Sequence, residues 1–386
     1  MIASPLGVPS CFGPHASGGR VLFIGSLPEP TTGQSLACKV FLDELQKRYC
    51  VDVVNLSKAS FKQGVNSWAR ILEVLKILRH VWKSSSTADV IYFTVSQSLA
   101  GNAKDLLIYS ICFSRLDRMI IHLHGGAGMR QLMRGSFGLT RRLNEFFLKR
   151  LAAIIVLGQR HTDVFAGAEH QTDMQIVPNF AEDFLFSHPE QIQAKFDQTL
   201  PLRILFLSNL LPGKGYTELF ESFAALSPLN REMIQIAFAG AFESEAQKIQ
   251  FLSLIAPFPQ LRYHGTVHGE QKRALFSDAH VFCLPTYYPY EGQPISILEA
   301  YAAGCAVITT DHSGIFDVFA DGINGFAVEK RSVADLASLL HSIVEDPSRL
   351  RQIALNNLKA AHCHTTTQYN SRLMQIVGKV RAETRA

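Results

Sequence analysis

The sequence predicts an α/β protein with two domains, each built around a mostly parallel sheet. Short apolar strands alternate with helical segments along the chain from Arg20 onward, a pattern typical of parallel sheets. The chain has 386 residues, which is enough for two domains of ordinary size. The strand pattern weakens around prolines at positions 178, 189 and 201 and then restarts at Arg203. We therefore expect a domain boundary there.

These features divide the chain into four parts. We expect a loose N-terminal tail over residues 1–19, a first domain over 20–180, a linker over 181–200 and a second domain over 201–367. The tail contains several prolines and glycines and no Lys or Arg, so it lacks the charged start and the apolar core of a signal peptide.

Composition excludes several classes of protein. With 47% hydrophobic and 18% charged residues the chain is globular rather than disordered. It contains no run of about 20 apolar residues of the kind that spans a bilayer. Its seven cysteines include no C-x2-C pair, which argues against a disulfide framework or a zinc site and favours a reducing compartment. We therefore expect the protein in the cytoplasm.

Charge is unevenly distributed between the two halves. The net charge is +4, but residues 1–180 carry +8 and residues 181–386 carry −4. Much of the positive charge lies between 130 and 150, among leucines and phenylalanines. Such a segment fits an anionic membrane surface or a phosphorylated acceptor, and equally a sheet-covering helix with solvated charges. No nucleic-acid-binding motif is present. The basic residues of interest are Arg130, Arg134, Arg141, Arg142 and Lys149.

The first predicted strand leads into a glycine-containing loop. Residues 20–25 are a compact apolar strand, and a helix is expected over 35–48. A strand, a loop and a helix in this order form the usual layout of a phosphate site, which draws attention to Gly33 and Gln34. The loop lacks the G-x-G-x-x-G fingerprint, so NAD binding is disfavoured, and a simple tight turn remains an alternative. Further strands are expected over 51–56, 88–94, 119–124, 153–157 and 175–179, with a helix over 68–83.

Two histidines lie at the end of the strand over 119–124. His122 and His124 share one face of that strand, but no third ligand at suitable spacing supports a metal site. His124 precedes two glycines at the carboxyl end of a parallel strand, where open α/β sheets place groups that contact ligands. A structural histidine is the alternative.

The second half repeats the alternation of strands and helices. A strand over 203–209 runs into Gly213-Lys214-Gly215, and a helix follows over 216–226. A lysine in a glycine loop before a helix suits a diphosphate, although the spacing is not that of a Walker loop. The remaining strands are expected over 234–238, 261–267, 280–285, 306–310 and 324–328, and the remaining helices over 271–279, 333–344 and 348–386.

Two glutamates, Glu291 and Glu299, are separated by seven residues. Pro294 suits the first turn of a helix and Gly304 suits its end, so Glu291 precedes the helix and Glu299 lies on it. Backbone N–H groups at the start of a helix bind anions, and each carboxylate can accept hydrogen bonds from two hydroxyls. The alternative is that both glutamates lie on a solvent-exposed face of a helix and bind nothing.

These two glutamates and their setting resemble the E-x7-E signature of the retaining glycosyltransferases of family 4, among the glycosyl transferases of group 1. The segment ending in Lys214 is similar to the G-R-L-x-x-x-K-G segment of that family, except that Asn209 stands where the family usually has arginine. An amide cannot neutralise a diphosphate, which puts the contribution of Asn209 in doubt.

The resemblance implies a role for each matching residue. Glu299 would hold the ribose of a sugar nucleotide, Glu291 would face the donor sugar, Lys214 would contact the diphosphate, and His124 would line the cleft beside the sugar. Glu291, Lys214 and His124 are the expected catalytic residues. The remaining donor contacts would come from Gly33, Gln34, Asn209, Gly265, Val267, Gly292, Gln293, Pro294 and Ile295.

The resemblance also implies a fold and an activity. We expect the GT-B fold, with two Rossmann-like domains facing across a cleft and a C-terminal helix over 368–386 packed back on the first domain. The implied enzyme is a hexosyl- or N-acetylhexosaminyl-transferase. It would use a UDP- or GDP-linked sugar without cofactor or metal and act on a saccharide or lipid-linked acceptor for cell-surface polysaccharide or glycolipid synthesis. A peripheral location on the cytoplasmic face of the inner membrane is consistent with such acceptors. The alternatives are a sugar-nucleotide epimerase or phosphorylase of the same fold, and a non-catalytic nucleotide-sugar or membrane-binding protein.

Overall fold

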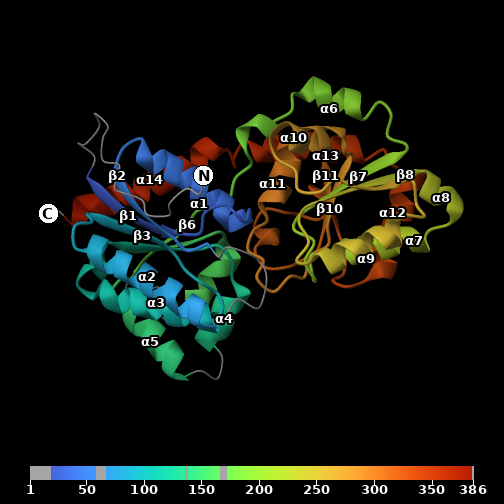
Figure 1. Cartoon of the computed structure of the whole chain (residues 1–386). Coiled ribbons are helices and arrows are strands. Elements are labelled where there is room, and N and C mark those ends of the chain that lie inside the picture. The colour runs from blue at the N-terminus through green and yellow to red at the C-terminus, as the bar shows by residue number, and fades with distance from the viewer. Residues whose placement is uncertain (1–18, 58–66, 135–137, 166–171, 385–386) are drawn as a thin grey trace, which may run out of the picture.

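The computed structural model describes residues 19–57, 67–134, 138–165 and 172–384, which form two α/β domains lying side by side (Figure 1). Each domain contains a six-stranded sheet in which every strand pair is parallel. The predicted α/β class with two parallel sheets is confirmed.

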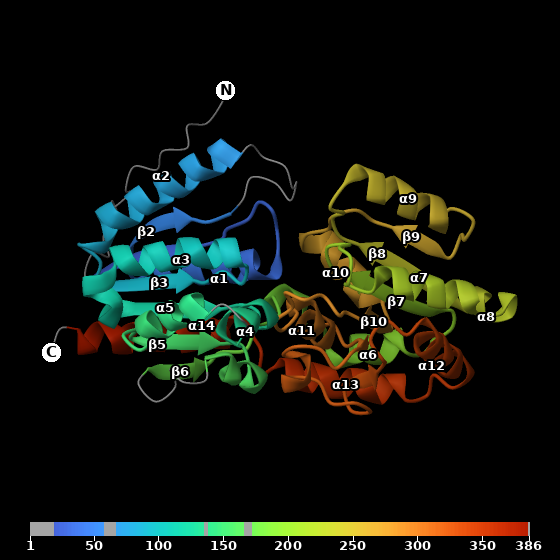
Figure 2. The same ribbon diagram turned by 90° about the horizontal axis from the view of Figure 1, so that it is seen from below.

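The first sheet has the strand order β2-β1-β3-β4-β5-β6. Side chains of a strand alternate between the two faces of the sheet, and β1 shows this clearly. Val21 and Phe23 pack with α1 and α14 on one face, while Leu22 and Ile24 pack with α2, α3 and α5 on the other. Both faces are therefore covered (Figure 2). The strands are β1 (Arg20–Gly25), β2 (Cys50–Asn55), β3 (Val90–Thr94), β4 (Met119–Leu123), β5 (Ala153–Val156) and β6 (Asp173–Ile176).

Helices and short 3-10 turns connect the strands of the first sheet. The helices are α1 (Gly33–Gln46), α2 (Ser67–Ser85), α3 (Leu99–Ile111), α4 (Ala127–Arg134) and α5 (Gly138–Leu148), with 3-10 turns η1 (Phe113–Arg118) and η2 (Gln159–Phe165). The sequence predicts one basic amphipathic segment over 130–150. In the structure the described parts of this segment include two helices, α4 and α5, rather than one.

The second sheet has the order β12-β11-β10-β7-β8-β9 and a single continuous apolar core. Its strands are β7 (Leu202–Leu207), β8 (Ile234–Ala239), β9 (Leu261–Tyr263), β10 (Val281–Leu284), β11 (Ala306–Thr309) and β12 (Gly325–Ala327). Its helices are α7 (Tyr216–Ala225), α8 (Pro228–Glu232), α9 (Glu245–Ile255), α10 (Gly269–Asp278), α11 (Ile295–Ala302), α12 (Val333–Glu345) and α13 (Leu350–Ala361), with a 3-10 turn η4 (Ile315–Asp317).

The segment between the domains is ordered rather than loose. Residues 181–200 include η3 (Asp183–Leu185) and α6 (Pro189–Lys195). Ile192 of α6 is fully buried and belongs to the core of the second domain. This part of the expected linker therefore packs as an element of the second domain.

The last helix returns to the first domain. α14 (Thr366–Glu383) follows the second domain in the chain, yet Tyr369, Leu373 and Val377 pack with the residues of β1, β3 and α1. The apolar face of α14 thus ties the end of the chain to the first sheet (Figure 1). Within the described residues, no helix combines the length and apolarity that crossing a bilayer would require.

Candidate active site

A cavity of about 530 Å³ lies between the two domains, beside the carboxyl ends of strands from both sheets. Open α/β sheets bind ligands at this edge. Its walls combine the loop before α1 and the end of β4 from the first domain with the loops after β7, β9 and β10 from the second. The predicted residues that line it are Gly33, Gln34, His124, Asn209, Lys214, Val267, Glu291, Gly292, Gln293, Pro294, Ile295 and Glu299.

Lys214 and Glu291 form an ion pair inside this cavity. The Lys214 Nζ lies 2.7 Å from the Glu291 Oε2, and the two side chains are 13% and 9% exposed. Thr286 Oγ1 donates a second hydrogen bond to the same oxygen at 3.1 Å. The lysine also lies over the ring of Tyr288, 4.7 Å from its centroid. A buried pair held by two neighbours, Thr286 and Tyr288, is preorganised to meet a charged or polyhydroxylated ligand.

The Lys214 loop requires glycine at position 215. Gly215 has a φ of 90° and caps α7 at its N-terminus. A Cβ there would collide with the Pro285 carbonyl, so only glycine lets the loop approach the end of β10. Because of this close approach, Lys214 in the loop after β7 reaches Glu291 in the loop after β10.

The Glu291 loop touches the first domain through Gly292. A side chain at Gly292 would overlap the backbone carbonyl of His124, so the two domains meet here backbone to backbone. The His124 ring lies beside the His122 ring, with centroids 4.0 Å apart, and the His122 Nδ1 is 2.6 Å from the Tyr92 hydroxyl. Among the described residues, no group of His, Cys, Asp or Glu side chains forms a metal-binding cluster.

His124 is a neutral side chain with unused hydrogen-bonding capacity. Burial lowers its pKa to about 3. Neither ring nitrogen has a hydrogen-bond partner in the described part of the chain. A neutral imidazole offers one donor and one acceptor, which suits a sugar hydroxyl better than a phosphate.

Glu299 lies on α11 and is held by a lysine that sequence reasoning missed. Lys272 of α10 contacts Glu299 and also Glu182, the latter at 2.7 Å. Burial alone would lower the pKa of Lys272, but the carboxylates of Glu299 and Glu182 raise it, so the ammonium form is stabilised. The two carboxylates share one positive charge, leaving an acceptor-rich end of the cavity.

Other predicted residues have structural roles of their own. The Gln293 side chain accepts from the Asn179 amide at 2.7 Å, and the Asn179 side chain donates to the Gln293 carbonyl at 2.6 Å, which joins the domains. Asn209 donates to the Thr31 carbonyl across the cleft at 3.3 Å. Gly265 is not part of the cavity wall, and Thr266 takes its place beside Val267.

The loop before α1 offers backbone donors to the cavity. Thr32 caps the helix by accepting from the Ser35 amide at 3.1 Å. Gly33 and Gln34 begin α1, and N–H groups in the first turn have no acceptor within the helix. Asn209, at the position of the family's arginine, carries no charge. Among the described residues that line the cavity, Lys214 and Lys272 supply the positive charge of lysine or arginine side chains.

The predicted basic surface falls into two groups. Arg130 and Arg134 pair with Asp163 at 2.8 and 3.1 Å, beside η2. The side chains of Arg141 and Arg142 on α5, and of Lys149 just after it, are exposed on the outer layer of the first domain. Arg130 and Arg134 are therefore partly neutralised by Asp163.

Comparison with known proteins agrees with this geometry. Residues 188–360 match the family described as Glycosyl transferases group 1. The solved structure of Anabaena HepE in complex with UDP and glucose matches with a TM-score of 0.68 and 17% identity, covering 94% of this chain and all of that one. Residues 188–360 thus resemble the glycosyl transferases of group 1, and the chain has the GT-B fold.

Two curated relatives match parts of the chain. The N,N'-diacetylbacillosaminyl-diphospho-undecaprenol alpha-1,3-N-acetylgalactosaminyltransferase of Campylobacter jejuni is 24% identical over 40% of this chain and 38% of the relative. The amylovoran biosynthesis glycosyltransferase AmsK of Erwinia amylovora is 24% identical over 48% of this chain and 46% of the relative. The chain therefore spans less than half the length of these relatives.

Proposed function

We propose that this protein is a retaining glycosyltransferase of family 4 that transfers a hexosyl or N-acetylhexosaminyl group from a UDP- or GDP-linked sugar. The acceptor would be a saccharide or a lipid-linked saccharide, in cell-surface polysaccharide or glycolipid synthesis. The observation that carries the proposal is the convergence of Lys214, Glu291 and Glu299 on one interdomain cavity. The match to the group 1 family and the activities for which the two relatives are named support it.

The cavity offers a distinct set of groups to each part of such a donor. The carboxylate of Glu299, oriented by Lys272, would accept from the ribose hydroxyls. Lys214 and the amides of Gly33 and Gln34 would neutralise the diphosphate, in a place where the usual arginine is replaced by Asn209. Glu291 and neutral His124 would hydrogen-bond the sugar hydroxyls.

The chemistry that fits this arrangement is substitution at the anomeric carbon with the leaving diphosphate as the base. The bond between the anomeric carbon and the diphosphate oxygen breaks, and the acceptor oxygen bonds to the same face of that carbon. The acceptor proton passes to the departing diphosphate. Lys214 and the helix N-terminus stabilise the charge that develops on the leaving group. Because Lys214 and the helix N-terminus neutralise the charge of the diphosphate, we expect activity without a metal ion.

The test is release of nucleoside diphosphate from UDP-glucose, UDP-galactose, UDP-N-acetylglucosamine and GDP-mannose, with excess EDTA and without acceptor. Slow release together with free sugar of unchanged configuration at C2 supports the transferase. A free 2-epimer would indicate an epimerase. Binding without any turnover would indicate a non-catalytic protein.

We also propose that the outer layer of the first domain docks on an anionic membrane surface. Among the described residues, ten of the seventeen exposed large apolar side chains lie on α2, α3, η1 and α5. On α2 they form a stripe at helical spacing, and Trp82 is 67% exposed. They are Ile71, Leu72, Leu75, Trp82, Leu99, Leu107, Phe113, Leu139, Leu143 and Phe146.

Basic side chains border this apolar surface. Lys76, Arg79 and Lys83 are exposed on α2, and Arg141 and Arg142 are exposed on α5. The helices α2, α3 and α5 lie together on one side of the first sheet (Figure 2). Two contributions stabilise a protein at a membrane surface. Apolar side chains insert between the lipid headgroups, and basic side chains attract anionic lipids. Docking would place the cleft near a lipid-linked acceptor.

A further inference from the structure

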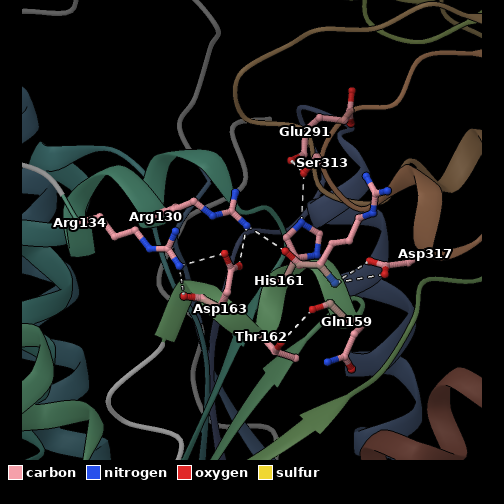
Figure 3. Close-up of polar contacts among 10 residues, drawn as sticks. Arg130, Arg134, Gln159, His161, Thr162, Asp163, Glu291, Ser313 and Asp317 are labelled. Carbon is pink, nitrogen blue, oxygen red and sulfur yellow. Dashed lines mark hydrogen bonds and ion pairs between the residues drawn. The ribbon is translucent and has the colours of Figure 1, made fainter. Parts of the chain in front are cut away.

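His161 lies at the junction of the two domains and takes part in none of the steps described above. It belongs to η2 of the first domain and is 1% exposed. Its ring fills a slot between Gly126 of the first domain and Gly314 of the second, where a Cβ at either glycine would collide with it. Figure 3 shows the ring pointing toward Ser313 and the Glu291 loop. Two glycines around one buried ring indicate a fitted contact rather than a loose one.

The hydrogen bonds of His161 run from the first domain to the Glu291 backbone. The His161 Nε2 is 3.1 Å from the Ser313 Oγ, and that hydroxyl donates to the Glu291 carbonyl at 2.7 Å. A serine hydroxyl has a single proton, so toward His161 it acts as the acceptor. The imidazole must therefore carry its proton on Nε2. Burial, with Arg130 nearby, lowers the pKa of His161 to about 4, which favours this neutral form.

The backbone at Ser313 indicates that its hydroxyl is needed. Ser313 has a φ of 50°, in the left-handed region where glycine is favoured. A side chain kept at such a position points to a use for that side chain. The same turn holds the loop a second time, because the Gly314 amide donates to the Gly292 carbonyl at 3.0 Å.

The turn that carries His161 is itself fixed on both sides. Arg130 of α4 donates to the Arg160 carbonyl at 2.9 Å and to Asp163 at 2.8 Å. From the other domain, Asp317 accepts from the Arg160 amide at 3.2 Å, and Asp311 pairs with the Arg160 side chain. Figure 3 shows the contacts of Arg130 with Asp163 and of Asp317 with the turn η2.

We propose that His161 is a positioning residue through which the first domain, by way of Ser313, fixes the Glu291–Gly292 backbone. The inference rests on the proposed function, because Glu291 is the residue that would face the donor sugar. In this arrangement Glu291 is correctly placed only while the two domains are apposed. Transfer then depends on a contact that nucleotide binding to the second domain does not require.

The test uses Ser313→Gly and His161→Leu, the double variant, and His161→Gln, whose amide can reach the Nε2 position. Amide hydrogen exchange of the peptide covering residues 286–298 is the first readout, because it does not depend on activity. We expect faster exchange at Glu291, whose amide donates to the Tyr288 carbonyl at 3.0 Å, in both single variants. His280→Leu is the matched control, since His280 is also fully buried but lies among Arg203 and Lys195.

Turnover gives the second readout. We expect Ser313→Gly to keep the thermal stability of the wild type, because glycine relieves the backbone, while kcat for diphosphate release falls about tenfold or more at unchanged KM. The double variant should be no worse than either single variant, and His161→Gln should recover part of the rate.

Unchanged exchange at the Glu291 amide in both single variants would overturn the inference. Losses of rate that multiply in the double variant would overturn it as well. A wild-type protein that binds none of the nucleotide sugars would instead refute the proposed function, and the exchange result would still show whether His161 fixes the loop.

Discussion

The Lys214 ammonium and the Glu291 carboxylate lie 2.7 Å apart, although they come from loops that follow different strands of the second sheet. In the proposed reaction the two groups serve opposite ends of the bond that breaks. Lys214 faces the leaving diphosphate and Glu291 faces the sugar, so a bound donor has to open or share this pair.

Removing either member of the pair should therefore abolish most of the turnover. We expect Lys214→Ala and Glu291→Gln each to lower kcat for diphosphate release by about 10²–10³, because each removes a largely buried, preorganised charge. Lys248→Ala, on α9 and not on the cavity wall, is the matched control, because this lysine also forms an ion pair, with Glu245 at 3.0 Å. Nearly wild-type rates for both cavity variants would refute their catalytic roles.

Lys272 should determine discrimination between ribose and deoxyribose. It orients the Glu299 carboxylate, and its loss would leave that carboxylate buried without a cation, favouring protonation. We expect Lys272→Met to bind the ribonucleoside diphosphate about tenfold more weakly and to change 2′-deoxynucleotide binding less.

Calorimetric titration of each nucleotide against wild type, Lys272→Met and Lys248→Met measures this discrimination. A ratio of affinities that stays constant across the three proteins would contradict the role of Lys272.

Buried histidines should make the fold sensitive to mild acid. Burial lowers the pKa of His124 to about 3, of His161 to about 4 and of His280 to about 4, and lowers that of His122 well below its usual range. The unfolded chain takes up these protons below about pH 6.5, whereas the folded chain does not. Their contribution to stability is therefore present above that pH and is lost as the pH falls.

The slope follows from proton linkage. Each histidine contributes about 1.4 kcal/mol per pH unit, so the four together approach roughly 5 kcal/mol per unit near pH 5. Urea midpoints followed by circular dichroism at about pH 7, 6 and 5 measure the loss. If the urea midpoint does not change over this range, the folded protein protonates these histidines as readily as the unfolded chain does.

Binding to anionic lipid should depend on α5. We expect Arg141→Glu with Arg142→Glu to abolish co-sedimentation with phosphatidylglycerol vesicles, since each basic residue near such a surface contributes about 1 kcal/mol. The matched control reverses two exposed lysines of the second domain, Lys330→Glu with Lys359→Glu. Equal binding by both double variants would argue against docking through the first domain.

Much of the fold could be predicted because its signals are local. The strand ahead of Gly25, the lysine between Gly213 and Gly215, and the placement of Glu291 before α11 and Glu299 on it all follow from runs of neighbouring residues. The parallel direction of the strands then follows from the alternation of helices and strands.

Contacts between distant parts of the chain left no such signal. Lys272 and Glu182 meet Glu299 from two other segments, and His161 reaches Ser313 from the other domain. Nothing in the spacing of these residues marks them, and a lysine on a helix is usually solvated.

The most direct measurement is calorimetric titration of the wild-type protein with the four nucleotide sugars in the presence of EDTA. We predict that one donor binds with a stoichiometry of one, and that Glu299→Gln weakens it about tenfold or more while Glu245→Gln, on the exposed first turn of α9, does not. Absence of binding by every donor, or equal binding by both variants, would contradict the assignment of the interdomain cavity as a nucleotide-sugar site.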